Sequence, residues 1–234
     1  MGILLAEMNL DSRIVLDFNA MHTPMLDRFS WMMSDMMAWL PFVMTWIYVL
    51  IKNKRSEAFL ILLVMALMIL VSDQVAHSIK PLVARPRPTR NMALIPLLEV
   101  VNDYHGGMYG FPSNHAANLF SLAVFSALLF RERLYTICIL VWATLISLTR
   151  VYLAVHYLSD ILCGAALGAL IGYGAFALYR YIVKYPILRA HNLPVEASDE
   201  THSGYAKRDL NLLLLVLATV TLSLLLAACI MDFQ

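Results

Sequence analysis

The stretch LNLLLLVLATVTLSLLLAACIM, residues 210–231, contains 22 residues and no charged side chain. A helix needs about 20 predominantly apolar residues to cross the ~30 Å hydrocarbon core of a bilayer. This stretch therefore predicts a transmembrane helix, and the rest of the chain is best interpreted as part of a membrane protein.

The composition of the whole chain supports the same conclusion. Of its 234 residues, 61% are hydrophobic and 14% are charged, whereas soluble domains have about 45–50% apolar and about 25% charged residues. This excludes a disordered chain and a small disulfide-rich scaffold, and it argues against a soluble enzyme. The formal net charge of +1 provides no basic field, so we expect no nucleic-acid partner.

We predict an all-α fold, an integral membrane bundle of six transmembrane helices with an N-terminal interfacial helix. The first apolar run is the least regular, because Pro41 lies inside it, and it could begin earlier, near Phe29. The expected spans are residues 36–51, 58–79, 115–130, 134–153, 157–179 and 210–231. They define a domain over residues 36–231. Residues 1–35 form either an amphipathic helix along the outer surface or a frayed chain end.

The distribution of Lys and Arg predicts the orientation of these spans. Basic residues gather in segments 52–55 and 131–133 and in the linker 180–209, which alternate consistently on one side. Short basic loops face the cytoplasm, so we expect a multi-pass protein of the cell (inner) membrane. Segments 80–113 and 150–156 then face the outside, toward the periplasm.

Segment 80–113 breaks this charge rule, because it carries Lys80, Arg85, Arg87 and Arg90 on the outer side. Three outward segments gather polar residues: KPLVARPRP at 80–88, PSNH at 112–115 and TRVYLAVHYLSD at 149–160. A charge at bilayer depth costs about 2.5–3.5 kcal/mol on insertion scales. Grouping these residues around a water-filled site at the outer membrane edge avoids most of that cost, so we predict a functional site there.

The cations of these segments suit a phosphoryl group. Lys80, Arg87 and Arg150 supply three positive charges, and the two guanidinium groups can hold phosphate oxygens with two hydrogen bonds each. Pro112 and Ser113 precede a predicted helix, whose first N–H groups have no intrahelical acceptor and can bind an anion. Together these groups predict a phosphate-binding cradle.

Two histidines complete a possible reaction centre. His156 and Asp160 are spaced i,i+4, so the carboxylate can hold one ring nitrogen and leave the other free to attack phosphorus. His115 can protonate the leaving oxygen. We expect no metal or cofactor, because the sequence shows no cluster of metal ligands and none of its cysteines has a partner at metal-site spacing. The cysteines are Cys138, Cys163 and Cys229.

The ordered motifs Lys-x6-Arg-Pro, Pro-Ser-x-His and Arg-x5-His-x3-Asp resemble those of the type 2 phosphatidic acid phosphatase superfamily. That family includes membrane lipid phosphatases and soluble vanadium haloperoxidases. The resemblance implies that His156 is the nucleophile, forming a phosphohistidine, and that His115 is the acid. Asn114 stands where the family usually has Gly; it keeps the backbone N–H for the phosphate, but its side chain adds bulk there. Thr149 replaces a Ser and retains the hydroxyl.

Several polar residues and glycines outside these motifs also have predicted roles. We expect Arg85 and Arg90 to be solvated or to contact lipid headgroups. Asp73 and His77 share a helix face with Lys80 and either support the site or form a polar helix end. Three residues of the outer loop could shape headgroup choice: Glu99, Asp103 and His105. Three small residues predict close helix packing: Gly164, Gly168 and Gly172.

The predicted function is a membrane phosphatase that acts on a lipid phosphate or diphosphate at the outer leaflet. We rank undecaprenyl diphosphate first, followed by phosphatidylglycerophosphate, phosphatidic acid and lipid A phosphates. Vanadate should inhibit, because it mimics the phosphoryl transition state. The alternatives are a transporter or channel, which needs ionisable residues near the membrane midplane, and a phosphate-binding protein in which Asn114 prevents turnover.

Overall fold

The computed structural model describes residues 8–184, 201 and 203–230. Over this part of the chain the regular structure is helical, apart from one isolated bridge between Pro86 and Tyr109. The all-α prediction is therefore confirmed. Most of the predicted linker, residues 185–200, lies outside the described residues.

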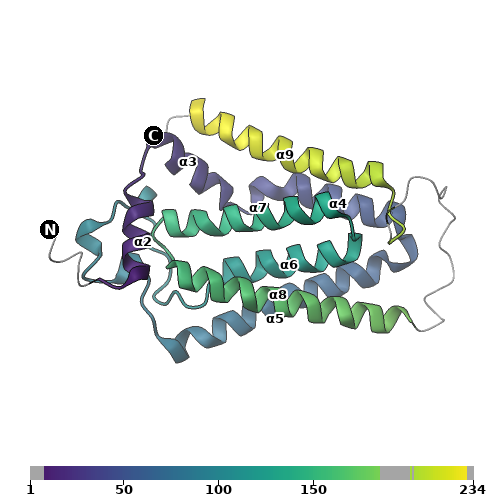
Figure 1. Cartoon of the computed structure of the whole chain (residues 1–234), viewed down its shortest axis with the longest axis horizontal. Coiled ribbons are helices and arrows are strands. Elements are labelled where there is room, and N and C mark those ends of the chain that lie inside the picture. Colours follow the sequence, from purple (N-terminus) through teal and green to yellow (C-terminus); the bar gives the residue numbers. More distant parts are fainter. Residues whose placement is uncertain (1–7, 185–200, 202, 231–234) are drawn as a thin grey trace.

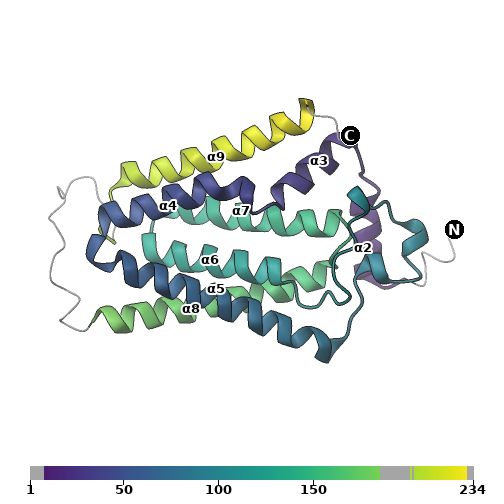
Figure 2. The same ribbon diagram turned by 180° about the vertical axis from the view of Figure 1, so that it is seen from behind.

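The helices form a bundle in which α6 and α7 run through the middle, with α4 and α9 along one side and α5 and α8 along the other (Figures 1 and 2). The helices are α2 (Leu10–Asn19), α3 (Pro24–Met33), α4 (Leu40–Asn53), α5 (Arg55–Val83), α6 (Asn114–Phe130), α7 (Arg133–Tyr152), α8 (Leu158–Val183) and α9 (Lys207–Ile230). Short 3-10 turns are η1 (Met37–Trp39), η2 (Pro88–Arg90), η3 (Ile95–Leu97) and η4 (Val101–Asp103).

Four of these helices, α5, α7, α8 and α9, are individually long and apolar enough to cross a membrane. Helix α3 and the segment Met37–Asn53 pass the same test only as a pair bent by 71°. Helix α6 is apolar but has only 17 residues. The multi-pass prediction is confirmed, whereas the number six remains a prediction.

The N-terminal segment forms two helices that serve different parts of the bundle. Helix α2 lies across one end of the bundle, against α7 and α8 (Figure 1). Helix α3 begins at Pro24 after the cap Thr23, whose hydroxyl accepts the Leu26 N–H at 3.2 Å, and it packs along α9 and α7. The first predicted span therefore corresponds to the second member of a bent helix pair, whose first member is α3.

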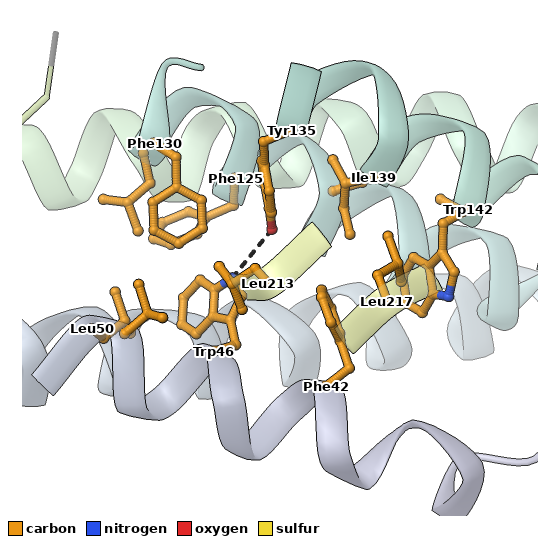
Figure 3. Packing of buried hydrophobic residues seen from close by; sticks show 14 of the residues in the cluster. Phe42, Trp46, Leu50, Phe125, Phe130, Tyr135, Ile139, Trp142, Leu213 and Leu217 are labelled. Carbon is orange, nitrogen blue, oxygen red and sulfur yellow. Dashed lines mark hydrogen bonds between the residues drawn. The ribbon is translucent and has the colours of Figure 1, made fainter. Parts of the chain in front are cut away.

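Aromatic side chains fill the core between α4, α6, α7 and α9 (Figure 3). The Trp46 indole N–H donates to the Tyr135 hydroxyl at 3.3 Å. Phe130 meets both Tyr135 and Tyr205 edge-on, with ring centroids 4.8 Å apart in each pair. Such packing buries large apolar areas in a fixed geometry, and it holds the end of the bundle at which α6 turns into α7.

Helices α6 and α8 approach each other through three of the four glycines of α8. A Cβ atom at Gly164, Gly168 or Gly172 would lie 2.5, 2.1 or 2.4 Å from a backbone carbonyl oxygen of α6 or of Ser113, the residue that caps it. Real Cβ atoms do not come so close, so each position requires glycine. The predicted packing role of these glycines is confirmed, and it places the first turn of α8 beside the first turn of α6.

The exterior of the bundle fits a bilayer. Helix α5 exposes a continuous apolar stripe of Phe59, Leu63, Leu67 and Leu70. The two turns that carry the basic segments 52–55 and 131–133 lie at one end of the bundle, while α2 and the segment 84–113 lie at the other (Figure 1). This separation of segments agrees with the alternation that the charge pattern predicts.

Candidate active site

The three sequence motifs meet at the end of the bundle covered by α2. There α5 and α7 end, and α6 and α8 begin (Figure 1). The Ser113 N–H, at the start of α6, donates to the Asp160 carbonyl oxygen in α8 at 3.0 Å. Residues separated by up to 80 positions in the sequence thus form one site.

His156 lies in the short connection between α7 and α8 and is buried, with 3% of its surface exposed. Its Nδ1 faces Asp160 Oδ2 at 3.4 Å, as the i,i+4 spacing predicts. The same carboxylate oxygen accepts the Tyr157 N–H at 3.0 Å, which fixes the first turn of α8. Asp160 is completely buried, so its orientation toward the ring is set by the fold.

Burial lowers the pKa of His156 to about 3, although the hydrogen bond to Asp160 acts in the opposite direction. The nearby charges of Arg87 and Arg150 lower it further. The imidazole is therefore neutral at physiological pH. With Nδ1–H directed at Asp160, the lone pair is on Nε2.

Arg87 lies directly at this Nε2 atom. Its Nη1 is 3.0 Å from His156 Nε2 and donates to the Val155 carbonyl at 2.9 Å. Arg150 is also buried, and its Nη2 donates to the Tyr104 hydroxyl at 3.3 Å. The Nε–H groups of both arginines are buried with no hydrogen-bond partner among the described residues. Buried donors normally have partners, so both guanidinium groups have capacity for an anion.

Lys80 is directed at the loop that precedes α6. Its ammonium donates to the Pro112 carbonyl at 2.7 Å and to the Gly110 carbonyl at 3.3 Å. An ammonium has three N–H groups, so one donor is left for a phosphate oxygen. In this structure Lys80 joins the end of α5 to the start of α6.

The start of α6 has the capped geometry that the Pro-Ser pair predicts. Ser113 is fully buried, and its hydroxyl accepts the Ala116 N–H at 3.3 Å. The N–H groups of Asn114 and His115 lie in the first turn, where a helix provides no acceptor. These two N–H groups and the positive end of the helix dipole make an anion-binding position.

The Asn114 side chain, expected beside the phosphate, is held by α5. Its amide nitrogen donates to Asp73 Oδ1 at 2.8 Å and to the Asp73 carbonyl at 3.1 Å. Asp73 therefore supports the start of α6, one of the two roles that its helix position suggests. His77, on the same predicted face, is exposed.

Arg85 is the residue that sequence reasoning placed wrongly. It is not a solvated loop residue: Nη1 donates to Asp160 Oδ1 at 3.0 Å and to the Ser159 hydroxyl at 2.6 Å. Its guanidinium also lies over the Tyr157 ring, 4.0 Å from the centroid. Arg90, in contrast, is exposed, and within the described part of the chain its side chain donates only to the Gly106 carbonyl, at 3.3 Å.

The remaining Arg85 contact leads to the N-terminal helix α2. Nη2 donates to Asp11 Oδ2 at 2.7 Å, and Asp11 also accepts the Ser159 N–H at 3.1 Å and the Ser159 hydroxyl. Burial opposes ionisation of Asp11, but the hydrogen bonds from Ser159 and Arg85 outweigh it and lower its pKa. No local sequence signal pairs residues 11, 85 and 159, so only the fold reveals this network.

The outer loop packs closely over these groups. A Cβ atom at Gly110 would lie 2.8 Å from Asp160 Oδ2, so this position admits only glycine. Glu99 is fixed through its backbone, which exchanges two hydrogen bonds with the Asn19 side chain at 2.8 and 2.9 Å. Asp103 and His105 pair at 2.9 Å in the exposed part of the loop. A role of these three residues in headgroup choice remains a prediction.

Among the described residues, no three His, Cys, Asp or Glu side chains are close enough to hold a metal ion. The chemical resources of the site are instead a neutral buried histidine on a carboxylate, a second histidine at a helix start and three cations. The Arg150 charge acts on both histidines. This set can accept a phosphoryl group on nitrogen and stabilise the charge on its oxygens.

Comparison with known proteins agrees with this geometry. Residues 59–184 match the family model of the PAP2 superfamily. A Bacteroides thetaiotaomicron protein named lipid A 4'-phosphatase is 38% identical over 174 residues, which cover 73% of this chain and 76% of the relative. A Porphyromonas gingivalis protein of the same name is 32% identical over 176 residues, covering 74% and 75%.

Two solved structures share the fold. The crystal structure of Aquifex aeolicus LpxE matches with a TM-score of 0.58 and 22% identity, over 73% of this chain and 97% of that one. A PAP2-type phosphatidylglycerolphosphate phosphatase from Bacillus subtilis matches with a TM-score of 0.55 and 23% identity, over 77% and 92%. The family match and the curated relatives together show that this chain belongs to the PAP2 superfamily, as a membrane lipid phosphatase.

Proposed function

We propose that this phosphatase removes the 4'-phosphate of lipid A at the outer leaflet of the inner membrane. The observation that carries the proposal is the 38% identity, over three quarters of both chains, to a protein named lipid A 4'-phosphatase. This changes the order of substrates that the sequence suggested. Undecaprenyl diphosphate becomes the main competing substrate.

In the first step, His156 Nε2 attacks phosphorus, the N–P bond forms and the bond to the sugar oxygen breaks. Asp160 at Nδ1 holds the tautomer and stabilises the positive charge that develops on the ring. His115 gives its proton to the departing sugar oxygen. The products are a dephosphorylated lipid and a phosphohistidine.

In the second step, His115 accepts a proton from a water molecule, which attacks the phosphohistidine. The N–P bond breaks, inorganic phosphate leaves and His156 Nε2 regains its lone pair. His115 is again protonated for the next turnover, so the two steps balance.

The cations stabilise the phosphoryl group as its geometry changes. Arg87 already lies at 3.0 Å from the attacking nitrogen, so a phosphate oxygen bound to its guanidinium is placed at the nucleophile. Arg150, Lys80 and the first N–H groups of α6 hold the remaining oxygens. Fixed donors of this kind supply most of the catalysis of phosphoryl transfer.

The test is phosphate release by detergent-purified protein from a panel of lipids with matched phosphate content. The panel contains bis-phosphorylated lipid A, undecaprenyl diphosphate, phosphatidylglycerophosphate and phosphatidic acid, and mass spectrometry of the lipid A product identifies which phosphate is lost. We expect the highest kcat/KM for lipid A, with loss from the 4' position. A higher kcat/KM for undecaprenyl diphosphate would overturn the substrate assignment.

The histidine variants test the mechanism separately from the substrate. His156→Ala should abolish release from every lipid, because no phosphohistidine can form. His115→Ala should slow lipids with a poor leaving group most, since they depend most on the acid. Vanadate should inhibit the wild type by occupying the phosphate position.

A further inference from the structure

A second polar site lies at the end of the bundle opposite to the catalytic residues. Two adjoining cavities open there, with volumes of about 390 and 510 Å³. Both are lined by α6 and α8, and their shared lining consists of Leu128, Arg131, Phe176, Arg180 and Lys184. We call this combined space the basic groove. It is separated from Ser113 by the length of α6, roughly 25 Å at 1.5 Å per residue.

The basic groove carries an excess of positive charge. Among the described residues that line it, the cations are Lys54, Arg131, Arg180 and Lys184, and the one carboxylate is Glu57. Glu57 is buried and accepts the Tyr179 hydroxyl. Among the described residues, none of the four cations forms an ion pair, although Lys52 and Arg208 at the same end both pair with Asp209.

A buried hydroxyl in the wall of the groove also lacks a partner. Tyr205 has 1% of its surface exposed, and its hydroxyl has no hydrogen-bond partner among the described residues. Its ring is fixed by Phe130, and the Lys54 ammonium lies 5.6 Å from the ring centroid. Buried tyrosine hydroxyls normally find a partner, so this oxygen indicates that the groove holds a polar ligand.

The other half of the groove is apolar and faces the bilayer. The larger cavity continues along α8 past Tyr173 and Ala177, which are exposed on the outside of the bundle, and beside Leu128 of α6. A ligand that fills the whole groove therefore needs acyl chains at one end and negative charge at the other. A free inorganic anion would leave the apolar half empty.

We propose that the basic groove binds an anionic glycerophospholipid from the leaflet opposite to the catalytic site. Its phosphate lies among Arg131, Arg180 and Lys184, and its acyl chains follow α8 toward the membrane interior. Basic pockets between transmembrane helices are suited to such headgroups. The bound lipid would join α6 to α8 at the end of the bundle where no glycine contact does so.

The experiment measures retained lipid on the full-length protein. Protein in mild detergent is incubated with equal amounts of dioleoyl phosphatidylglycerol and dioleoyl phosphatidylcholine, and bound lipid is counted by native mass spectrometry. We expect a clear preference for phosphatidylglycerol. The double variant R131Q/R180Q should lose about tenfold of that preference or more, because two basic contacts are removed, and Tyr205→Phe should lose a smaller part.

The matched control is R133Q/R208Q, which removes two cations from the same end of the bundle but outside the groove. It should retain the wild-type preference. Equal loss in the two double variants would show that only overall charge matters, and equal retention of both lipids by the wild type would overturn the site. Displacement of the lipid by an equal concentration of inorganic phosphate would also overturn it. Lipid retention requires no turnover, so this result is independent of the substrate proposed above.

Discussion

Arg85 donates a hydrogen bond of 3.0 Å to Asp160, the carboxylate that faces His156. The other carboxylate oxygen of Asp160 points to the imidazole and to the Tyr157 N–H. Asp160 therefore has a cation on one side and a histidine on the other. These contacts fix the direction of the carboxylate toward the ring, which is what an orienting carboxylate requires.

Replacing Arg85 should impair turnover more than substrate binding. Arg85→Ala leaves Asp160 Oδ1 buried without this donor. We expect kcat to fall roughly tenfold to a hundredfold, the range typical of removing a group that orients a functional side chain. KM should change little. Arg90→Ala is the matched control, because Arg90 is exposed and its side chain donates to a loop carbonyl away from Asp160. A uniform loss of folded protein, with normal kcat in the remainder, would contradict an orienting role.

Asp11 should make stability depend on pH at the acid end. Its folded-state pKa lies below the ordinary aspartate value of 3.8, so its contribution is fully present above pH 3.8 and is lost as the pH falls through the lower folded value. Asp11→Asn should remove this dependence and also lower kcat through Arg85. Thermal unfolding between pH 2.5 and pH 6 tests it. Asp17→Asn, an exposed position on the same helix, should leave the curve unchanged.

His156 should also make stability depend on pH, because burial lowers the pKa of its imidazole. Its pKa falls from 6.5 to about 3 on burial, so between these values the unfolded chain binds a proton that the folded chain does not. Stability must then rise with pH across this window. His156→Gln should flatten that rise, measured as the difference in Tm between pH 4 and pH 7.5. An unchanged slope would mean that His156 is protonated in the folded protein.

Gly168→Ala should destabilise the bundle and slow the enzyme. Its Cβ would lie 2.1 Å from the Ala117 carbonyl oxygen, so α6 and α8 must separate, and overpacking of this kind costs about 1–3 kcal/mol. The control is Gly174→Ala, where nothing lies within 4 Å of the new Cβ. Tm in detergent and kcat should both fall in the first variant and stay near wild type in the second.

Asn114→Gly restores the residue that the family usually has. The backbone N–H remains available to phosphate, so we expect kcat to be retained within a fewfold. Two hydrogen bonds to Asp73 are lost, which should reduce stability by about 1–2 kcal/mol. Asp73→Ala removes only the Oδ1 acceptor and keeps the backbone carbonyl, so it should cost less, and the double variant N114G/D73A little more than N114G alone. Strictly additive losses would rule out the contact.

The sequence predicted the fold class and the meeting of the motifs because both depend on local patterns. The uncharged run that forms α9 has few alternatives to a membrane helix. The i,i+4 spacing of His156 and Asp160 predicted their contact, which forms although His156 lies in the connection before α8. The link between Arg85 and Asp11 was missed because 74 positions separate them and neither belongs to a repeating pattern. The partner of Asn114 was missed for the same reason, since Asp73 lies on another helix.

The length of α6 is a feature that the hydropathy pattern did not predict. Its apolar run was recognised, but its 17 residues place it at the lower limit of the length of a transmembrane helix. The helix begins at Asn114, after the cap Ser113, so its first N–H groups lie at the candidate site. The cap sets where this helix starts, and hydropathy alone does not reveal it.

The contact of the α8 glycines with the α6 backbone has a consequence for how a bulky lipid reaches His156. The proposed phosphate position lies between two parts of the bundle that are held together in different ways. On one side, Gly164 and Gly168 lie against carbonyls with no room to slide, so α6 and α8 behave as a single rigid block. On the other, α5 is attached to that block through Lys80 and Asp73 by side-chain hydrogen bonds. Lipid headgroups should be admitted by yielding of the α5 side, while the nucleophile and its carboxylate stay still.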